Sequence, residues 1–332
     1  MAEVDAAAAA AAGFAPMERG PFDAGFPRLL GGVSLVRGEG FYQDLYDTPF
    51  ADEWLGGLAV TLVESYELGF DEWPDLLALS FSALDNVGHD FGPNSPEVLD
   101  ALLRLDRVLG ELFAFLDQRL GEGAYLVAFS SDHGVVPLPE VVGEPARRIG
   151  VEEVLCLRRA AAGFAARHGG DPWLGAPWYL DHAALGSDAG RAAAVAAAQA
   201  ELEARLEACP HVAEVWTANQ LASSTADART AEPGTAAWYE ALYRNSYHPE
   251  RSPDVLLQWQ PLFLPRAGSG TTHGSPYAYD THVPLLLMGP GLAAGEVPDV
   301  VLTVDLAPTL ATLLDVPIPE EIDGVDRRQL LP

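Results

Sequence analysis

Two short apolar runs, each closely followed by polar residues, stand out in the first half of the chain. They cover residues 76–82 and 125–131, and the turn-forming sequence Trp73-Pro74-Asp75 precedes the first of them. Continuous apolar runs of this length are typical of strands that are buried on both faces of a sheet. We therefore predict two buried β-strands over these ranges.

Helical periodicity surrounds the two predicted strands. Thr48-Pro49 and Ser95-Pro96-Glu97 each place a capping residue before a proline, the pattern that favours the start of a helix. The first helix is predicted from about Pro49 to Leu68, and the second from Ser95 to the Gly121-Glu122-Gly123 sequence. The strand–helix–strand order predicts parallel strand pairing inside an α/β sandwich.

The pattern changes beyond the second strand. An alanine-rich helix is predicted near residues 190–209 and a short strand over 211–217, among loops rich in Trp, Pro and Gly. Apolar strands resume at 254–259 and 283–288, and a last helix, with Asp305 as its predicted N-cap, ends near Asp315. We predict an irregular leader over 1–40, a core formed by 41–140 and 251–332, and an inserted cap subdomain over 141–250.

Composition narrows the classes of function. The 332 residues include 48 acidic and 19 basic side chains, which gives a formal net charge of −29, and every basic residue is an arginine. A nucleic-acid-binding surface needs an excess of cations, so this charge balance argues against one. The chain has no apolar run long enough for a membrane span, and its first twelve residues lack the features of a signal peptide.

Cys156 and Cys209 are the two cysteines. Two cysteines are too few for a disulfide framework, and their spacing matches no zinc motif. We expect two free thiols, with a single disulfide as the alternative.

Three short motifs carry residues of the types that bind metals. Asp85 and His89 are four positions apart, so one helical turn would place both side chains on the same face. Asp132 and His133 follow the second apolar run, and Gly134 would relax the backbone where that strand ends. His273 lies in a loop rich in Gly, Ser and Thr.

Each motif alone has an ordinary structural explanation. Asp85 and His89 would fit a surface turn, Asp132 would fit a capping residue beside a half-buried histidine, and His273 would fit a solvated loop. Together, however, carboxylates and imidazoles near the ends of predicted strands are typical of a metal site in an α/β protein. We therefore predict that Asp85, His89, Asp132, His133 and His273 converge on divalent metal.

The amino-acid sequences of these motifs also resemble those of a known family. The sequences Asp85-Asn86-Val87-Gly88-His89, Ser131-Asp132-His133-Gly134, Thr272-His273-Gly274-Ser275-Pro276-Tyr277 and Asp280-Thr281-His282-Val283-Pro284 resemble the alkaline phosphatase superfamily. The resemblance is to the branch that contains phosphate-irrepressible alkaline phosphatases and type I phosphodiesterases/nucleotide pyrophosphatases. It covers about residues 40–140 and 250–332, and it implies a three-layer α/β/α sandwich.

The resemblance implies two zinc ions. One ion would be held by Asp85, His89 and His273, and the other by Asp132, His133 and one further Asp. In the family, that further Asp and the Thr or Ser nucleophile lie upstream of everything matched here. We therefore expect an N-terminally incomplete chain whose catalytic nucleophile lies in a missing N-terminal segment.

The implied activity is metal-dependent hydrolysis of small phosphate esters, by an alkaline phosphatase-type phosphomonoesterase that forms a covalent phospho-Thr or phospho-Ser. The alternatives are a phosphodiesterase or nucleotide pyrophosphatase of the same superfamily, or a non-catalytic metal-binding fragment. The resemblance also implies a periplasmic or secreted protein, although this chain shows no signal peptide.

Overall fold

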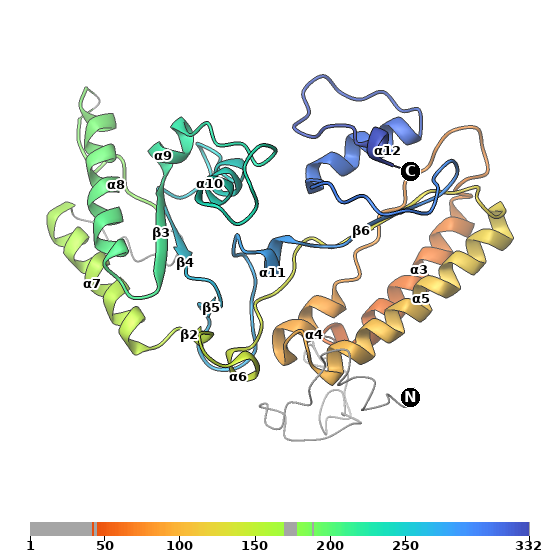
Figure 1. Ribbon diagram of the computed structural model, residues 1–332, viewed down its shortest axis with the longest axis horizontal. Coiled ribbons are helices and arrows are strands. Elements are labelled where there is room, and N and C mark those ends of the chain that lie inside the picture. Colours follow the sequence, from red (N-terminus) through yellow and green to blue (C-terminus); the bar gives the residue numbers. More distant parts are fainter. Residues whose placement is uncertain (1–41, 43–44, 169–177, 188, 332) are drawn as a thin grey trace.

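The computed structural model describes residues 42, 45–168, 178–187 and 189–331. Figure 1 shows two lobes joined by extended segments. The first lobe contains helices α3–α5, strands β1 and β6, and the C-terminal elements. The second contains α7–α10 with β3 and β4.

Three helices form the N-terminal part of the first lobe: α3 (Pro49–Ser65), α4 (Ala83–Phe91) and α5 (Pro96–Leu120). The two proline-led starts are confirmed, and the Ser95 side chain accepts a hydrogen bond from the backbone N–H of Val98, as an N-cap does. Helices α3 and α5 pack closely at Gly56. A Cβ there would lie only 2.4 Å from Val108 Cγ1, so this contact needs a glycine. The packed helices support α4, which carries two of the predicted ligands.

The strand pairing differs from the sequence-based expectation. β1 (Val127–Ser130) pairs with β6 (Leu285–Met288), and the pairing is antiparallel. The predicted strand at residues 76–82 forms no strand, because no described segment hydrogen-bonds alongside it, and Leu76 is 81% exposed. A strand needs a neighbour as well as an apolar sequence. The predictions of parallel pairing and of full burial for these segments were therefore wrong within the described residues.

The second lobe has its own hydrophobic core. α7 (Val151–His168) and α8 (Arg191–Glu207) pack with β3 (Val212–Thr217) and β4 (Val255–Trp259). The predicted alanine-rich helix and the strands in this region are confirmed. The buried core combines alanines of the helices and Cys209 with larger apolar side chains, among them Leu157, Phe164, Trp178, Leu202, Leu206, Val215 and Val255.

The sequence pattern assigned residues 254–259 to the core, and β4, which lies in this range, pairs antiparallel with β3, with Val215 opposite Leu257. The short helices α9 (Ala218–Ser223) and α10 (Ala236–Asn245) follow β3 in the second lobe. Between the lobes lie α6 (Pro139–Val142) and β2 (Arg147–Arg148), and β2 pairs parallel with β5 (Phe263–Leu264). The division into core and inserted cap stays a prediction.

Cys156 and Cys209 form a disulfide, with their Cα atoms 5.6 Å apart. The expectation of two free thiols was wrong because α7 and the end of α8 bring residues 53 positions apart into contact, which spacing alone does not show. The bond closes a long loop around the core of the second lobe.

Replacing both cysteines by alanine is expected to lower the free energy of unfolding by about 2–4 kcal/mol, since the disulfide restricts the unfolded chain. Thermal melts with and without reductant would measure the effect. Reductant should lower the melting temperature of the wild-type protein and leave that of the double variant unchanged. Equal melts of the oxidised wild type and the double variant would contradict the prediction.

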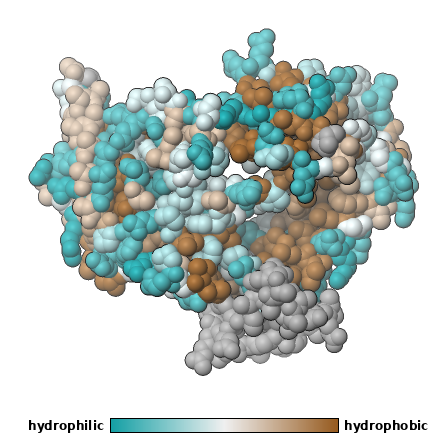
Figure 2. Space-filling model, in the orientation of Figure 1, coloured by the Kyte–Doolittle hydropathy of each residue, from teal (hydrophilic) through white to brown (hydrophobic). Residues whose placement is uncertain are grey.

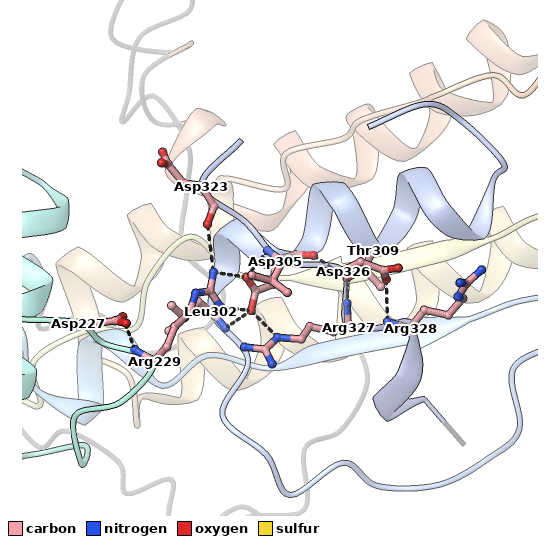
Figure 3. A network of polar contacts seen from close by, with 10 residues as sticks. Asp227, Arg229, Leu302, Asp305, Thr309, Asp323, Asp326, Arg327 and Arg328 are labelled. Carbon is pink, nitrogen blue, oxygen red and sulfur yellow. Dashed lines mark hydrogen bonds and ion pairs between the residues drawn. The ribbon is translucent and has the colours of Figure 1, made fainter. Parts of the chain in front are cut away.

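Helix α11 (Ala278–Thr281) lies between the lobes (Figure 1). The C-terminal elements that follow β6 are the 3-10 turn η1 (Thr303–Asp305), α12 (Leu306–Leu313) and the 3-10 turn η2 (Arg328–Leu330). Asp305 occupies the predicted N-cap position, but its side chain makes no capping bond. Instead, the fully buried carboxylate pairs with Arg229 at 2.6 Å and with Arg327 at 2.8 Å (Figure 3). Because Arg229 lies between α9 and α10, this network connects the two lobes.

Candidate metal centre

Helix α4 presents the first two predicted ligands together. Asp85 and His89 lie one turn apart, and Asp85 Oδ2 is 3.4 Å from His89 Nε2. Ala83, Val87 and Gly88 are the buried residues of this helix. The i, i+4 spacing therefore gives the helix one buried face and one face that carries a carboxylate beside an imidazole.

His273 joins this pair from a distant part of the sequence. One ligand atom each from Asp85, His89 and His273 lie within 4.8 Å of one another, and all three side chains are half-buried. The loop is fixed by backbone contacts, since Thr271 N–H donates to the carbonyl of His89 at 2.7 Å. Gly270 permits this approach, because a Cβ there would lie 2.3 Å from the same carbonyl oxygen. Two imidazoles and a carboxylate form a donor set that suits a divalent transition metal such as zinc.

The segment after β1 reaches the same cluster, but only one of its two predicted ligands, His133, packs into it. The His133 ring stacks on the His273 ring, with centroids 3.4 Å apart and an interplanar angle of 15°. The Asp132 side chain is 82% exposed, although its Oδ2 lies 3.4 Å from His133 Nε2. The structure therefore brings Asp85, His89, His133 and His273 together, while Asp132 lies beside them at the surface.

Backbone carbonyls hold two of the rings. His89 Nδ1 lies 2.8 Å from the carbonyl oxygen of Thr271, and His133 Nδ1 lies 2.9 Å from that of Gly134. A ring nitrogen beside a carbonyl oxygen must carry the proton and donate it, which assigns the tautomer. The Nε2 lone pairs of both rings are therefore available to a cation.

The electrostatics of His273 also favour metal binding. Burial lowers the pKa of His273, and the neighbouring His133 lowers this pKa further. A histidine whose pKa is lowered stays neutral at physiological pH, and only the neutral ring has a lone pair for a metal.

Gly134 serves a purpose that the sequence did not indicate. Its φ is not in the left-handed region, so conformational freedom is not what the position requires. Its N–H donates to the carbonyl of Asp280 at 2.7 Å, and a Cβ there would lie 2.1 Å from the carbonyl oxygen of Tyr279. The glycine thus allows the Asp132–His133 segment to lie directly against α11.

Gly134→Ala is expected to lower the free energy of unfolding by about 1–3 kcal/mol and to weaken cation binding, because the backbone atoms that it meets cannot move aside cheaply. Chemical denaturation and a zinc titration would measure the two effects. The matched control is Gly88→Ala in α4, where a Cβ meets nothing within 4 Å and alanine favours the helix. Equal stability of the Gly134→Ala and wild-type proteins would contradict the prediction.

Comparisons with known proteins agree with this geometry. Residues 34–280 match the family model described as type I phosphodiesterase / nucleotide pyrophosphatase. The chain belongs to this family of the alkaline phosphatase superfamily. The fold matches about half of alkaline phosphatase PafA: the wild-type crystal structure aligns with 88% of this chain and 54% of the PafA chain, with a TM-score of 0.74 at 27% identity.

Curated relatives include the alkaline phosphatase PafA of Elizabethkingia meningoseptica, 30% identical over 83% of this chain, and the alkaline phosphatase PhoK of Sphingomonas sp, 32% identical over 90% of this chain. The matches cover 50% of PafA and 54% of PhoK, so the chain spans about half the length of these relatives. The family and the relatives are hydrolases of phosphate compounds. Over the described residues, every helix is too short or too polar to cross a membrane.

Proposed function

We propose that this chain carries the metal-binding half of a phosphate ester hydrolase of the alkaline phosphatase type. The observation that supports this most directly is the convergence of Asp85, His89 and His273, whose ligand atoms lie within 4.8 Å of one another, with the His133 ring stacked on that of His273. The ion that we propose is Zn²⁺, because imidazole and carboxylate donors in this combination suit it best. The substrate that we propose is a small phosphate monoester.

The residues of this chain would perform two tasks in that reaction. Asp85, His89 and His273 would hold one cation, and His133 with Asp132 would contribute to a second position beside it. A bound divalent cation stabilises negative charge on phosphoryl oxygens and lowers the pKa of an oxygen bound to it. The backbone contacts that fix the His89 and His273 segments to each other would keep this geometry rigid.

We further propose that the Thr or Ser nucleophile and one additional Asp ligand come from a preceding polypeptide segment. Exposed apolar side chains support this proposal, because Leu286 and Met288 of β6 are 61% and 48% exposed in a sheet of two short strands. Figure 2 shows apolar surface gathered around the hollow at the middle of the molecule. Apolar strands of this kind are normally covered or paired by further chain.

A diesterase is the second candidate, and the description of the matching family model favours it. A non-catalytic metal-binding protein is the remaining alternative. We propose a periplasmic or secreted location, and the Cys156–Cys209 disulfide supports it because such bonds persist in oxidising compartments.

The test compares the 332-residue chain with the same chain extended by the polypeptide encoded in frame ahead of Met1. Both forms are loaded with Zn²⁺ and assayed with p-nitrophenyl phosphate and bis-p-nitrophenyl phosphate. We expect zinc binding by both forms and hydrolysis by the extended form alone, faster with the monoester. Faster diester hydrolysis would favour the second candidate. An extended form that is folded and loaded with zinc, yet hydrolyses neither ester, would refute the proposal.

A further inference from the structure

The Asp280 carboxylate has one oxygen whose burial nothing in the fold explains. Asp280 lies in α11 and is 3% exposed. Its Oδ2 accepts a hydrogen bond from the N–H of Ser275 at 2.7 Å. Its Oδ1 is shielded from solvent and has no hydrogen-bond partner. A buried polar atom without a partner costs about 1–3 kcal/mol, so this oxygen calls for a ligand or a partner that forms in another state of the protein.

Asp280 lies at the metal centre. Its backbone carbonyl accepts the Gly134 N–H, which anchors the segment that carries His133. Its Oδ2 accepts the N–H of Ser275, which lies two residues after His273 in the same loop. The carboxylate is therefore held against the loop that carries His273.

The His273 ring differs from the other two imidazoles in its support. His89 and His133 each have Nδ1 beside a backbone carbonyl oxygen, at 2.8 Å and 2.9 Å. Among the described residues, no acceptor lies at hydrogen-bond distance from either ring nitrogen of His273. An imidazole that binds a metal through one nitrogen holds a proton on the other, and a carboxylate or carbonyl normally accepts it.

We propose that Asp280 is a positioning residue for His273: its Oδ1 accepts the ring N–H of His273 that faces away from the bound cation. This contact would fix both the tautomer and the orientation of the ring, and it would give the buried oxygen its partner. The inference rests on the proposed cation site and adds a residue to it.

Asp280→Asn is the sharpest variant. The Ser275 N–H is a donor, so the amide oxygen of asparagine must face it, and the amide NH₂ then replaces Oδ1. The variant keeps the shape and presents a donor where the His273 N–H requires an acceptor. The matched control is Asp254→Asn, which alters another buried carboxylate that accepts from a histidine, His182 at 2.7 Å, in the second lobe.

The experiment titrates the metal-free proteins with Zn²⁺ by calorimetry and with Co²⁺ by visible absorption, and it records thermal melts of each metal-free protein. We expect Asp280→Asn to raise the Kd for Zn²⁺ by about 10–100-fold and to change the Co²⁺ spectrum. Asp254→Asn should leave both unchanged, even if it lowers the melting temperature.

A folded Asp280→Asn protein with the wild-type Kd and spectrum would overturn this inference and leave the proposed function intact. Failure of the wild-type protein itself to bind either ion would overturn both. If Asp280→Asn does not fold, proton NMR of the zinc-loaded wild-type protein decides the question. The inference expects a downfield ring N–H resonance that is absent in His273→Gln, and its absence from the wild-type spectrum would contradict the inference.

Discussion

Asp305→Asn is expected to lower the free energy of unfolding by about 3–5 kcal/mol, the typical cost of removing one partner from a buried ion pair. The carboxylate is fully buried and pairs with Arg229 and Arg327 (Figure 3). The backbone N–H groups of Leu302 and Val325 also donate to it, at 3.3 Å and 2.9 Å. The variant would leave two guanidinium groups without their counter-charge, and it would weaken the contact between the lobes.

The same network predicts a dependence on pH. Burial alone would raise the pKa of Asp305, but the hydrogen bonds from Arg229 and Arg327 outweigh it and hold the pKa well below its usual range. A carboxyl group with a depressed pKa stabilises the folded state fully above its unfolded pKa of about 3.9, and this contribution is lost as the pH falls toward the folded pKa. The stability difference between wild type and Asp305→Asn should therefore shrink below about pH 4.

Urea denaturation at several pH values would measure both effects. The control is Asp299→Asn, an exposed carboxylate nearby, which should change the stability by less than about 0.5 kcal/mol. A double-mutant cycle between Asp305→Asn and Arg229→Met would separate the pairwise interaction from the other losses. An Asp305→Asn protein as stable as the control would contradict the prediction.

His273→Ala is expected to raise the Kd for Zn²⁺ by more than about 100-fold, since the loss of a ligand should exceed the 10–100-fold effect of losing an outer hydrogen-bond partner. His273 is the member of the cluster that comes from outside α4, so its removal leaves only Asp85 and His89 to hold the ion. A calorimetric titration of metal-free protein with Zn²⁺ would measure the change.

The His273 ring also stacks on His133, so a second variant must separate packing from ligation. His273→Phe keeps an aromatic ring and lacks ligand atoms, and it should bind zinc as weakly as His273→Ala. His282→Ala removes an exposed histidine nine positions away and should bind zinc like the wild type. Strong zinc binding by a folded His273→Phe protein would place the ion elsewhere.

The amino-acid pattern determined the local elements well. Proline-led helix starts and leucine periodicity located α3 and α5, and short apolar runs located β3 and β4. The same pattern identified Asp85, His89 and His273 as candidate ligands, and the structure brings these three together. Helix periodicity and helix ends are readable from sequence because both depend on residues within a few positions of each other.

Only the tertiary structure decided which distant groups meet. The antiparallel pairing of β1 with β6 and the contact of Gly134 with α11 both depend on residues more than 140 positions apart. The Cys156–Cys209 disulfide and the pairing of Asp305 with two arginines were equally hidden, and so was the unpartnered oxygen of Asp280. Strand partners, charge compensation and close backbone approach are set by which segments pack together, and no local sequence pattern records that choice.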